Sequence, residues 1–256
     1  LRSLAEKADG TEDLWNGDPV WWKYSSPVLF PIVGKLAAGT YRVDGREYEL
    51  PAHGLGRISE FRLVGQTTGS LTFALQWSPV SLQHYPYKFR LEISYVLQGK
   101  EVQVKWKVRN LDKHTMYFSI GAHPALRCPI VSGERLTDCY LEFSSPEKAG
   151  KLAITPDCLL THNRVPALDG RTQELSDEFF REGVLVFDDL RSDSITIRSR
   201  KSEKSLTVKA NGFPYWGIWA PEKGGAPFIC IEPWYGHADY ADFVGEVAEK
   251  AMKKTV

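Results

Sequence analysis

The feature of this sequence that most limits its fold is a succession of short, β-rich runs separated by turn residues. In residues 102–108 every second side chain is apolar, and Gln or Lys stands between them. This is the period of a strand with one buried face and one exposed face. Residues 98–100 (Gln-Gly-Lys) separate this run from the one before it and predict a hairpin turn.

Similar runs recur along the chain, at residues 41–43, 71–76, 89–97, 102–108, 116–120, 140–143, 184–187, 194–197, 205–208 and 228–231. Many short strands with few helices between them predict an all-β sandwich or barrel rather than βαβ units. The chain has 256 residues, of which 43 % are apolar, and this is enough for a sizeable core. We therefore expect residues 1–256 to form a single all-β domain.

Helical patterns are scarce. Residues 1–7 suit either a helical turn or the end of a strand, and residues 176–181 suit another turn. Residues 240–254 carry apolar side chains at roughly helical spacing, which predicts a surface helix. Because the sequence begins with Leu1 and not Met, we expect that the original N-terminus is either missing from it or has been processed.

Composition excludes several functional classes. The chain carries 32 basic and 32 acidic side chains, and this neutral balance argues against binding to nucleic acid or to an anionic membrane surface. No stretch reaches the roughly 18 apolar residues of a membrane-spanning helix. The four cysteines form no Cys-x-x-Cys pair and no evident disulfide framework, so we expect a protein of the reducing cytoplasm.

Common cofactor and nucleophile motifs are absent from the sequence. Gly34 and Gly39 have the spacing of a phosphate loop, but Thr40 and Tyr41 stand where Lys and Ser or Thr are required. No Gly-x-Ser-x-Gly nucleophile motif occurs. No two histidines are spaced as His-x-x-x-His, so we expect neither a dedicated metal site nor an organic cofactor.

Aromatic residues are abundant, with eight Trp, eleven Tyr and twelve Phe. Aromatic side chains favour strands, and their flat rings also line sugar sites, where they face the C–H side of a pyranose. For any single ring, however, burial in the core is the more frequent role.

Two histidine-containing segments are candidates for a site. His53 and Arg57 lie in a loop rich in Pro and Gly, where binding groups are often found, although loop residues of these types are frequently only solvated. His123 follows an apolar strand and Gly121, and Pro124 favours an extended backbone before it. The alternative for His123 is a structural ring that is satisfied by a backbone carbonyl.

Glu232 is the strongest candidate for chemistry. It ends an apolar strand and is followed by Pro233, Trp234 and Tyr235. Burial there should raise the pKa of its carboxyl towards the range that suits a general base. The alternative is a structural ion pair, for instance with Arg57.

Taken together, these segments resemble the aldose 1-epimerase (galactose mutarotase-like) family, and most of all its compact bacterial branch. The matching stretches are residues 15–19, 26–34, 53–57, 121–125, 217–219 and 231–236, with Asp239 after them. The resemblance implies a large twisted antiparallel β-sandwich with a sugar cleft on one face. It also implies that Glu232 is the catalytic base, that His123 is the catalytic acid, and that His53 and Arg57 contact the sugar.

The chemistry of such a family needs one base and one acid. To interconvert α and β anomers, a proton leaves the C1 hydroxyl while another reaches the ring oxygen, and the steps then reverse on the other face. A carboxylate and an imidazolium suffice, without a metal or an organic cofactor. The expected partner is a small-molecule sugar, and we expect a monomer or a homodimer.

The sequence departs from the family pattern in two places. Gly183 stands where an Asp usually helps to hold the sugar, and neither Glu182 nor Asp188 matches that position. The family pattern also continues beyond Val256 with a further strand. Three alternatives remain: a preference for hexose 6-phosphates held by Arg57, a non-catalytic carbohydrate-binding or sugar-sensing protein, and a structural protein whose aromatics are all core.

Overall fold

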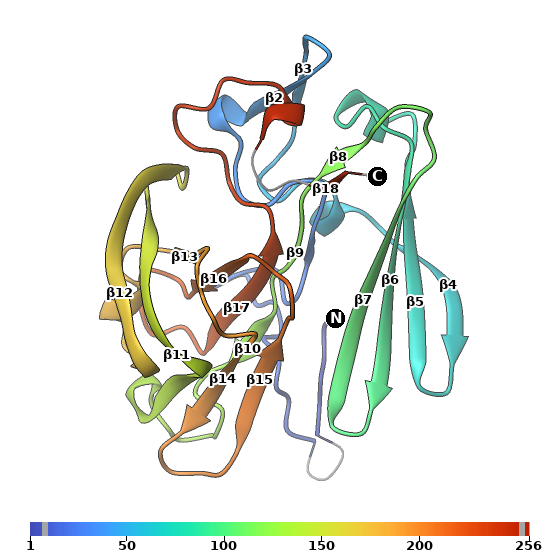
Figure 1. Cartoon of the computed structure of the whole chain (residues 1–256). Helices are drawn as coiled ribbons and strands as arrows, with labels where there is room; N and C mark the ends of the chain where they lie inside the picture. Colours follow the sequence, from blue (N-terminus) through green and yellow to red (C-terminus); the bar gives the residue numbers. More distant parts are fainter. Residues whose placement is uncertain (7–9, 251–253, 256) are drawn as a thin grey trace.

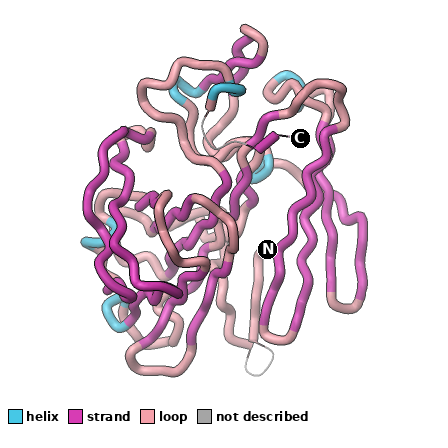
Figure 2. Tube along the Cα trace, viewed as in Figure 1, coloured by secondary structure: helices cyan, strands magenta, loops and turns pink. Residues whose placement is uncertain are grey.

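A computed structural model describes residues 1–6, 10–250 and 254–255 of the chain, and it confirms the all-β prediction. Antiparallel strands dominate these residues, and the helical segments among them are single short 3₁₀ turns (Figures 1 and 2). The turns are η1 (Ala37–Gly39), η2 (Gly56–Ile58), η3 (Ser81–Gln83), η4 (Leu136–Asp138), η5 (Glu178–Phe180) and η6 (Val247–Glu249). None of the described helices is long and apolar enough to cross a membrane.

The larger sheet has ten strands. They are β1 (Val28–Leu29), β9 (Ile120–Ala122), β10 (Ala125–Arg127), β11 (Cys139–Ile154), β12 (Leu160–Glu174), β13 (Leu185–Phe187), β14 (Ser194–Ser199), β15 (Ser205–Lys209), β16 (Tyr215–Trp219) and β17 (Phe228–Tyr235). Their main order is β1-β9-β17-β16-β13-β11-β14-β15, with β10 also on β17 and β12 on β11. The long β11–β12 hairpin contains three register shifts. Such bulges bend and twist a ladder, and this hairpin is visibly curved (Figure 1).

The second sheet has four strands in the order β4-β5-β6-β7. They are β4 (Arg62–Thr67), β5 (Ser70–Gln76), β6 (Phe89–Gln98) and β7 (Glu101–Asn110). The expected hairpin joins β6 to β7, and Gly99 takes the positive φ of 62° that the turn requires. Two short pairs complete the fold: β2 (Thr40–Val43) with β3 (Arg46–Glu49), and β8 (Tyr117–Phe118) with β18 (Lys254–Thr255).

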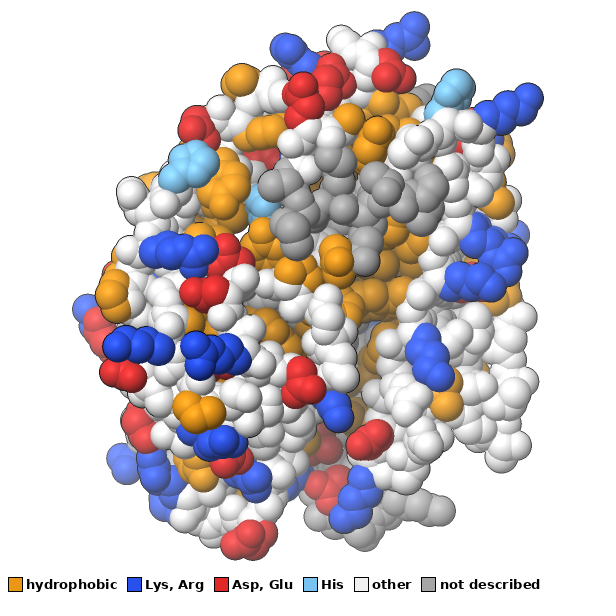
Figure 3. Space-filling view, viewed as in Figure 1, with side chains coloured by type: hydrophobic (Ala, Val, Ile, Leu, Met, Phe, Trp, Pro, Cys, Tyr) orange, Lys and Arg blue, Asp and Glu red, His pale blue; other side chains and the backbone are white. Residues whose placement is uncertain are grey.

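The two sheets enclose an apolar core. Val28 and Ile120 of the larger sheet share a buried cluster with Phe89, Leu91 and Ile93 of β6. In the space-filling view, apolar side chains are visible between the sheets, while acidic and basic side chains intermingle on the outer surface of this face (Figure 3). This packing of sheet on sheet is a β-sandwich.

The alternation along β17 separates core from site. Ile229 and Ile231 pack into a second buried cluster with Trp216 and Ile218 of β16. Because successive strand side chains point to opposite faces, Glu232 points away from that cluster. The apolar run that ends in Glu232 thus anchors the strand on one side and presents the carboxylate on the other.

The predicted surface helix over residues 240–254 is wrong. Within the described part of this segment, the backbone forms isolated bridges at Tyr240 and Glu246, the 3₁₀ turn η6 and strand β18. Residues 251–253 lie outside the described residues. Tertiary hydrogen bonds replace the helical ones, since the N–H of Ala241 donates to the carbonyl of Leu160. The expected turn within residues 176–181 is confirmed by η5. Near the N-terminus Ala5 bridges Glu12, which fits the end of a strand, and Lys7 lies outside the described residues.

Candidate active site

The register of the larger sheet brings His123 and Glu232 together. Gly121 of β9 lies opposite Trp234 of β17, and Ala125 of β10 lies opposite Cys230 of the same strand. His123 lies midway between Gly121 and Ala125, and Glu232 lies midway between Cys230 and Trp234. Pro124 has no N–H to give to a ladder, and the edge along β17 is interrupted there. The two candidate groups therefore face each other across this break, more than a hundred positions apart in sequence.

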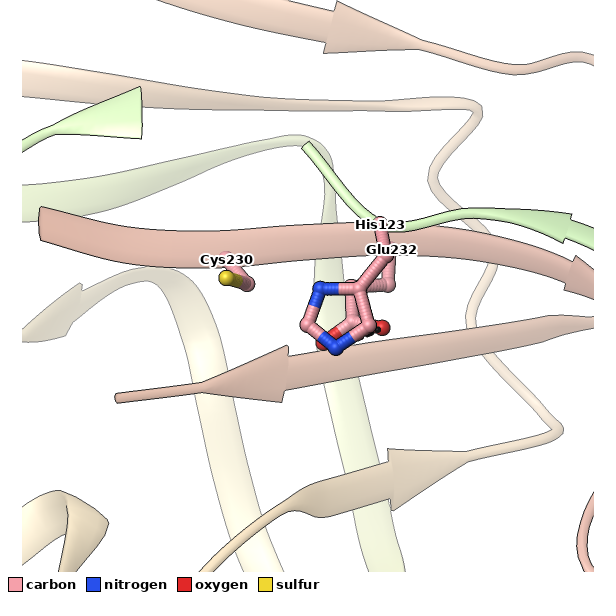
Figure 4. A group of neighbouring side chains, drawn as sticks. All are labelled: His123, Cys230 and Glu232. Carbon is pink, nitrogen blue, oxygen red and sulfur yellow. Dashed lines mark ion pairs between the residues drawn. The ribbon is translucent and has the colours of Figure 1, made fainter. Parts of the chain in front are cut away.

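Their side chains are close and almost fully buried. His123 Nε2 lies 3.3 Å from Glu232 Oε2, and the exposed fractions of the two residues are 7 % and 1 %. Figure 4 shows the imidazole reaching over β17 to the carboxylate. The contact lacks the geometry of a hydrogen bond, so Glu232 Oε2 is buried without a hydrogen-bond partner. The other ring nitrogen of His123, Nδ1, is also buried without one. Buried polar atoms without partners are uncommon and call for a cause.

Burial also sets the protonation of the pair. Loss of water raises the pKa of the Glu232 carboxyl well above its usual range, and the neighbouring Trp234 indole offsets this only in part. Burial likewise lowers the pKa of His123 well below its usual range, with further lowering from His53 and Arg57. Both shifts oppose charge, so burial favours the neutral form of each group: a protonated Glu232 beside an uncharged His123.

Two glycines make room for the ring beside this pair. A Cβ on Gly217 of β16 would lie 2.4 Å from an atom of the Trp234 ring, and a Cβ on Gly121 would lie 2.6 Å from another. Contacts that short do not occur between real atoms, so the Trp234 ring lies flat on the sheet only because both positions lack side chains. The glycines in the Gly217-Ile-Trp and Gly121-Ala-His segments are therefore required for packing next to Glu232.

His53 is held as a neutral ring with a defined tautomer. Its backbone has a positive φ of 65°, and its N–H donates to the carbonyl of Gly34. The N–H of Gly34 in turn donates to His53 Nδ1 at 3.1 Å. Burial lowers the pKa of His53 to about 3, with the Arg57 charge adding to the effect. Since Nδ1 accepts, the proton is on Nε2, which is available as a donor. The His53 ring lies 5.5 Å from the His123 ring, edge to face.

Arg57 is the fourth predicted site residue, and it lies in turn η2. Its guanidinium stands 5.0 Å from the centre of the Tyr24 ring, and its Nε is buried without a hydrogen-bond partner. Among the described residues no carboxylate forms an ion pair with Arg57, and the acidic partner of His123 is Glu232. The alternative of a structural Arg57–Glu232 ion pair is therefore wrong.

Aromatic side chains cover the pair, and of Trp22, Trp219 and Tyr24 only Trp219 lies in a stretch that matches the family pattern. The Trp22 ring stacks on the His123 imidazole with 4.5 Å between centres, and the Trp219 ring meets the imidazole edge-on at 5.8 Å. Tyr24 meets Trp22 edge-on at 5.5 Å. For Trp22, the only hint in the sequence was that Trp15, Trp21 and Trp22 cluster in one loop.

Cys230 is a further neighbour that sequence reasoning missed. It lies two residues before Glu232 on β17 and so points to the same face. Its Sγ, a nitrogen of His123 and an oxygen of Glu232 all lie within 4.8 Å of one another (Figure 4). Within the described part of the chain, this is the group of His, Cys and acidic residues whose spacing suits a metal ion.

Neither acidic residue near Gly183 replaces the expected Asp. Glu182 forms an ion pair with Lys151, and Asp188 forms one with Arg164 at 2.7 Å. Instead, Glu222 Oε1 lies 2.9 Å from the place that a Cβ of Gly183 would take. A carboxylate from a different loop thus occupies the space of the missing side chain.

The fold and the site define a class: an antiparallel β-sandwich with a buried carboxylate–imidazole pair under an aromatic cover. The chain belongs to the aldose 1-epimerase family, whose sequence profile matches residues 2–254. It is 37 % identical over 245 residues to the chromosomal LacX protein of Lactococcus lactis subsp. lactis, covering 92 % of this chain and 81 % of that protein. It is 27 % identical over 136 residues to the galactose mutarotase of Homo sapiens, covering 46 % and 39 % of the two chains.

Solved structures of related proteins have the same fold. A galactose mutarotase related enzyme from Lactobacillus acidophilus superimposes with a TM-score of 0.94 at 29 % identity, over 100 % of this chain and 85 % of that one. A galactose mutarotase-like protein from Lactobacillus casei gives a TM-score of 0.92 at 27 % identity, over 100 % and 88 %. The family and the fold inferred from the sequence are both confirmed.

Proposed function

We propose that this protein is an aldose 1-epimerase, an isomerase that interconverts the α and β anomers of a hexose or hexose phosphate. One observation carries the proposal: His123 Nε2 and Glu232 Oε2 lie 3.3 Å apart in a buried site. The two oxygens that exchange protons, O1 and the ring oxygen, are both bonded to C1 of the sugar. A base and an acid that serve them must stand side by side, and this pair does.

The pair begins with one proton and needs no other. In the closed site the proton is on Glu232, because burial disfavours both charges. Sugar hydroxyls that enter bring polar partners, and the proton passes to His123. The Glu232 carboxylate then takes the proton of the C1 hydroxyl while the His123 imidazolium gives one to the ring oxygen. The ring opens, C1 turns about the C1–C2 bond, and the reverse transfers close it on the other face.

Two further groups fit the binding of sugar hydroxyls. His53 offers its Nε2 proton beside His123, and Arg57 offers a buried Nε–H that has no partner in the protein. Both are donors, and a hydroxyl oxygen accepts from either. A sugar oxygen that satisfies Arg57 Nε removes the penalty of an unpaired buried donor, which is typically about 1–3 kcal/mol.

The aromatic cover implies that binding moves Trp22. This ring stacks on the face of His123 where a sugar must come, so the sugar takes its place. The C–H face of a pyranose can then lie against the Trp219 or Trp22 ring. The four cysteines are free thiols, and this supports a protein that works in the reducing cytoplasm.

The experiment is a measurement of anomer exchange by NMR on glucose, galactose and their 6-phosphates. We expect acceleration in proportion to protein concentration on at least one of the four. A preference for the 6-phosphates would indicate that Arg57 binds the phosphate group. Replacement of Arg57 by Gln should then remove that preference. Lack of acceleration on every sugar would refute the proposal for these substrates.

A sugar-binding protein without catalysis is the second candidate. Gly183, in place of an Asp that helps to hold the sugar in the family, favours it over an active enzyme. Under this alternative a sugar broadens its own NMR lines in the presence of the protein, but the exchange rate between its anomers does not rise. The retained His123–Glu232 pair argues for the enzyme, since a binder needs no acid next to a base.

A further inference from the structure

We propose that His123, Cys230 and Glu232 form a binding site for a thiophilic divalent cation of the zinc class, and that this cation switches the enzyme off. Cation binding stands on geometry alone. Its inhibitory effect rests on the proposed epimerase function. In the described structure the three side chains converge from β17 and from the break between β9 and β10.

The spacing suits tetrahedral coordination. Zinc binds His nitrogen at about 2.0–2.1 Å and carboxylate oxygen at about 2.0–2.2 Å, so two such ligands on a tetrahedron are separated by about 3.4 Å. His123 Nε2 and Glu232 Oε2 are already 3.3 Å apart. A nitrogen of His123, an oxygen of Glu232 and the Cys230 sulfur all lie within 4.8 Å of one another, so a side-chain adjustment of Cys230 completes the set.

The donor set selects the kind of ion. One sulfur, one imidazole nitrogen and one carboxylate oxygen suit zinc and similar metals, whereas calcium and magnesium prefer oxygen ligands alone. Three protein ligands leave a fourth position for water, which is the arrangement of an accessible zinc site rather than a structural one. Binding releases two protons to solvent, one from the Cys230 thiol and one from the Glu232 carboxyl, because both groups coordinate in their deprotonated forms.

A second observation points to a ligand at this place. Glu232 Oε2 and His123 Nδ1 are buried without hydrogen-bond partners, in residues with exposed fractions of only 1 % and 7 %. A cation bound to Glu232 Oε2 supplies the interaction that this oxygen lacks. Coordination also occupies the lone pairs through which Glu232 and His123 exchange protons with the sugar. The cation and the reacting sugar therefore exclude each other.

Cobalt(II) is the probe of choice, because a cysteine thiolate bound to it gives a charge-transfer absorption in the near ultraviolet. Titration of the whole chain should produce this band and saturate at one equivalent. Cys230→Ser should lose the band, and Cys158→Ser is the matched control because Cys158 is a partly exposed thiol in the turn before β12. No band in the natural protein, or a band that persists without Cys230, would overturn the site.

Because Cys230 is fully buried, Cys230→Ala and His123→Asn are tested beside the serine variant, and circular dichroism shows which of them fold. Zinc inhibition of anomer exchange is then measured for each active variant against its own rate without metal. We expect EDTA to reverse the inhibition, and we expect Cys230→Ser or Cys230→Ala to need at least about tenfold more zinc. Equal sensitivity would overturn the inhibitory role. A cobalt band in a protein without exchange activity would refute the epimerase function and leave the cation site standing.

Discussion

Replacement of Glu232 by Gln should stabilise the fold while it abolishes the reaction. The side chain keeps its shape, but it loses its titratable proton. The folded-state pKa of Glu232 is raised above the ordinary value of 4.5 by burial. Between pH 4.5 and the folded-state pKa, the unfolded chain releases this proton while the folded protein retains it. The free energy of unfolding of the natural protein therefore falls as pH rises through this window, and the Gln variant escapes that loss.

The magnitude follows from proton linkage. Each pH unit in the window changes the free energy of unfolding by at most about 1.4 kcal/mol. From pH 4.5 to pH 7 the ceiling is thus about 3 kcal/mol, reached if Glu232 stays protonated throughout. His123 contributes with the opposite sign, since its lowered pKa makes stability fall as pH drops below 6.5. His123 is present in both proteins, so comparing the difference between them at two pH values removes the part of its contribution that does not depend on residue 232.

Urea unfolding at pH 5 and pH 7, followed by tryptophan fluorescence, measures the effect. We expect Glu232→Gln to gain stability relative to the natural protein as pH rises, and to lose about 10²–10⁴-fold in the rate of anomer exchange. Glu182→Gln is the control, because Glu182 is exposed and paired with Lys151. If Glu232→Gln is no more stable relative to the natural protein at pH 7 than at pH 5, the resting carboxyl is ionised and our account of the pair is wrong.

Four other predictions follow from the same geometry. His123→Asn should lower kcat for anomer exchange by about 10²–10⁴-fold with little change in KM, whereas a higher KM at unchanged kcat would make His123 a binding residue only. Trp22→Phe should remove most of the fluorescence change that a bound sugar causes, and Trp77→Phe should retain it; an unchanged signal in Trp22→Phe would show that Trp22 does not move. Gly217→Ala should cost about 1–3 kcal/mol of stability through the clash with Trp234, while Gly65→Ala, whose Cβ would meet Thr72 at an ordinary 3.5 Å, should cost much less; equal losses would contradict the packing argument. The rate of anomer exchange should fall at low pH, where the His123–Glu232 pair gains a second proton, and at high pH, where the pair loses its only one. A rate that does not change with pH would contradict catalysis by a shared proton.

The fold was predictable where strands alternate and unpredictable where they do not. Strand β7 shows the two-residue period plainly, and its bounds were predicted to within two residues. Strand β12 was missed because its sequence is largely polar and contains Pro166 and Gly170. The one described strand that it pairs with is β11, and its buried apolar residues are few, so the sequence shows no regular alternation there. The spacing in residues 240–254 misled because tertiary hydrogen bonds outweighed a weak helical propensity.

The site was predictable as a list of residues but not as an arrangement. Glu232 and His123 each follow a run of apolar residues in the sequence, and this marks them as candidates, although β17 in fact continues through Glu232 to Tyr235. Their contact depends on the register of β17 with β9 and β10, which no local pattern encodes. The position of Cys230 could have been predicted from the sequence, since the two-residue period of a strand places it on the same face as Glu232. Trp22 was not, because its stack on His123 is set by a loop.

The most direct test of the central claim is the rate of exchange between the α and β anomers, measured by NMR on the preferred sugar with the natural protein and with Glu232→Gln. The account predicts acceleration that rises with the concentration of the natural protein and vanishes in the variant, while the variant still broadens the sugar lines by binding. Full acceleration by Glu232→Gln would show that this carboxylate is not the base, and would contradict the account at its centre.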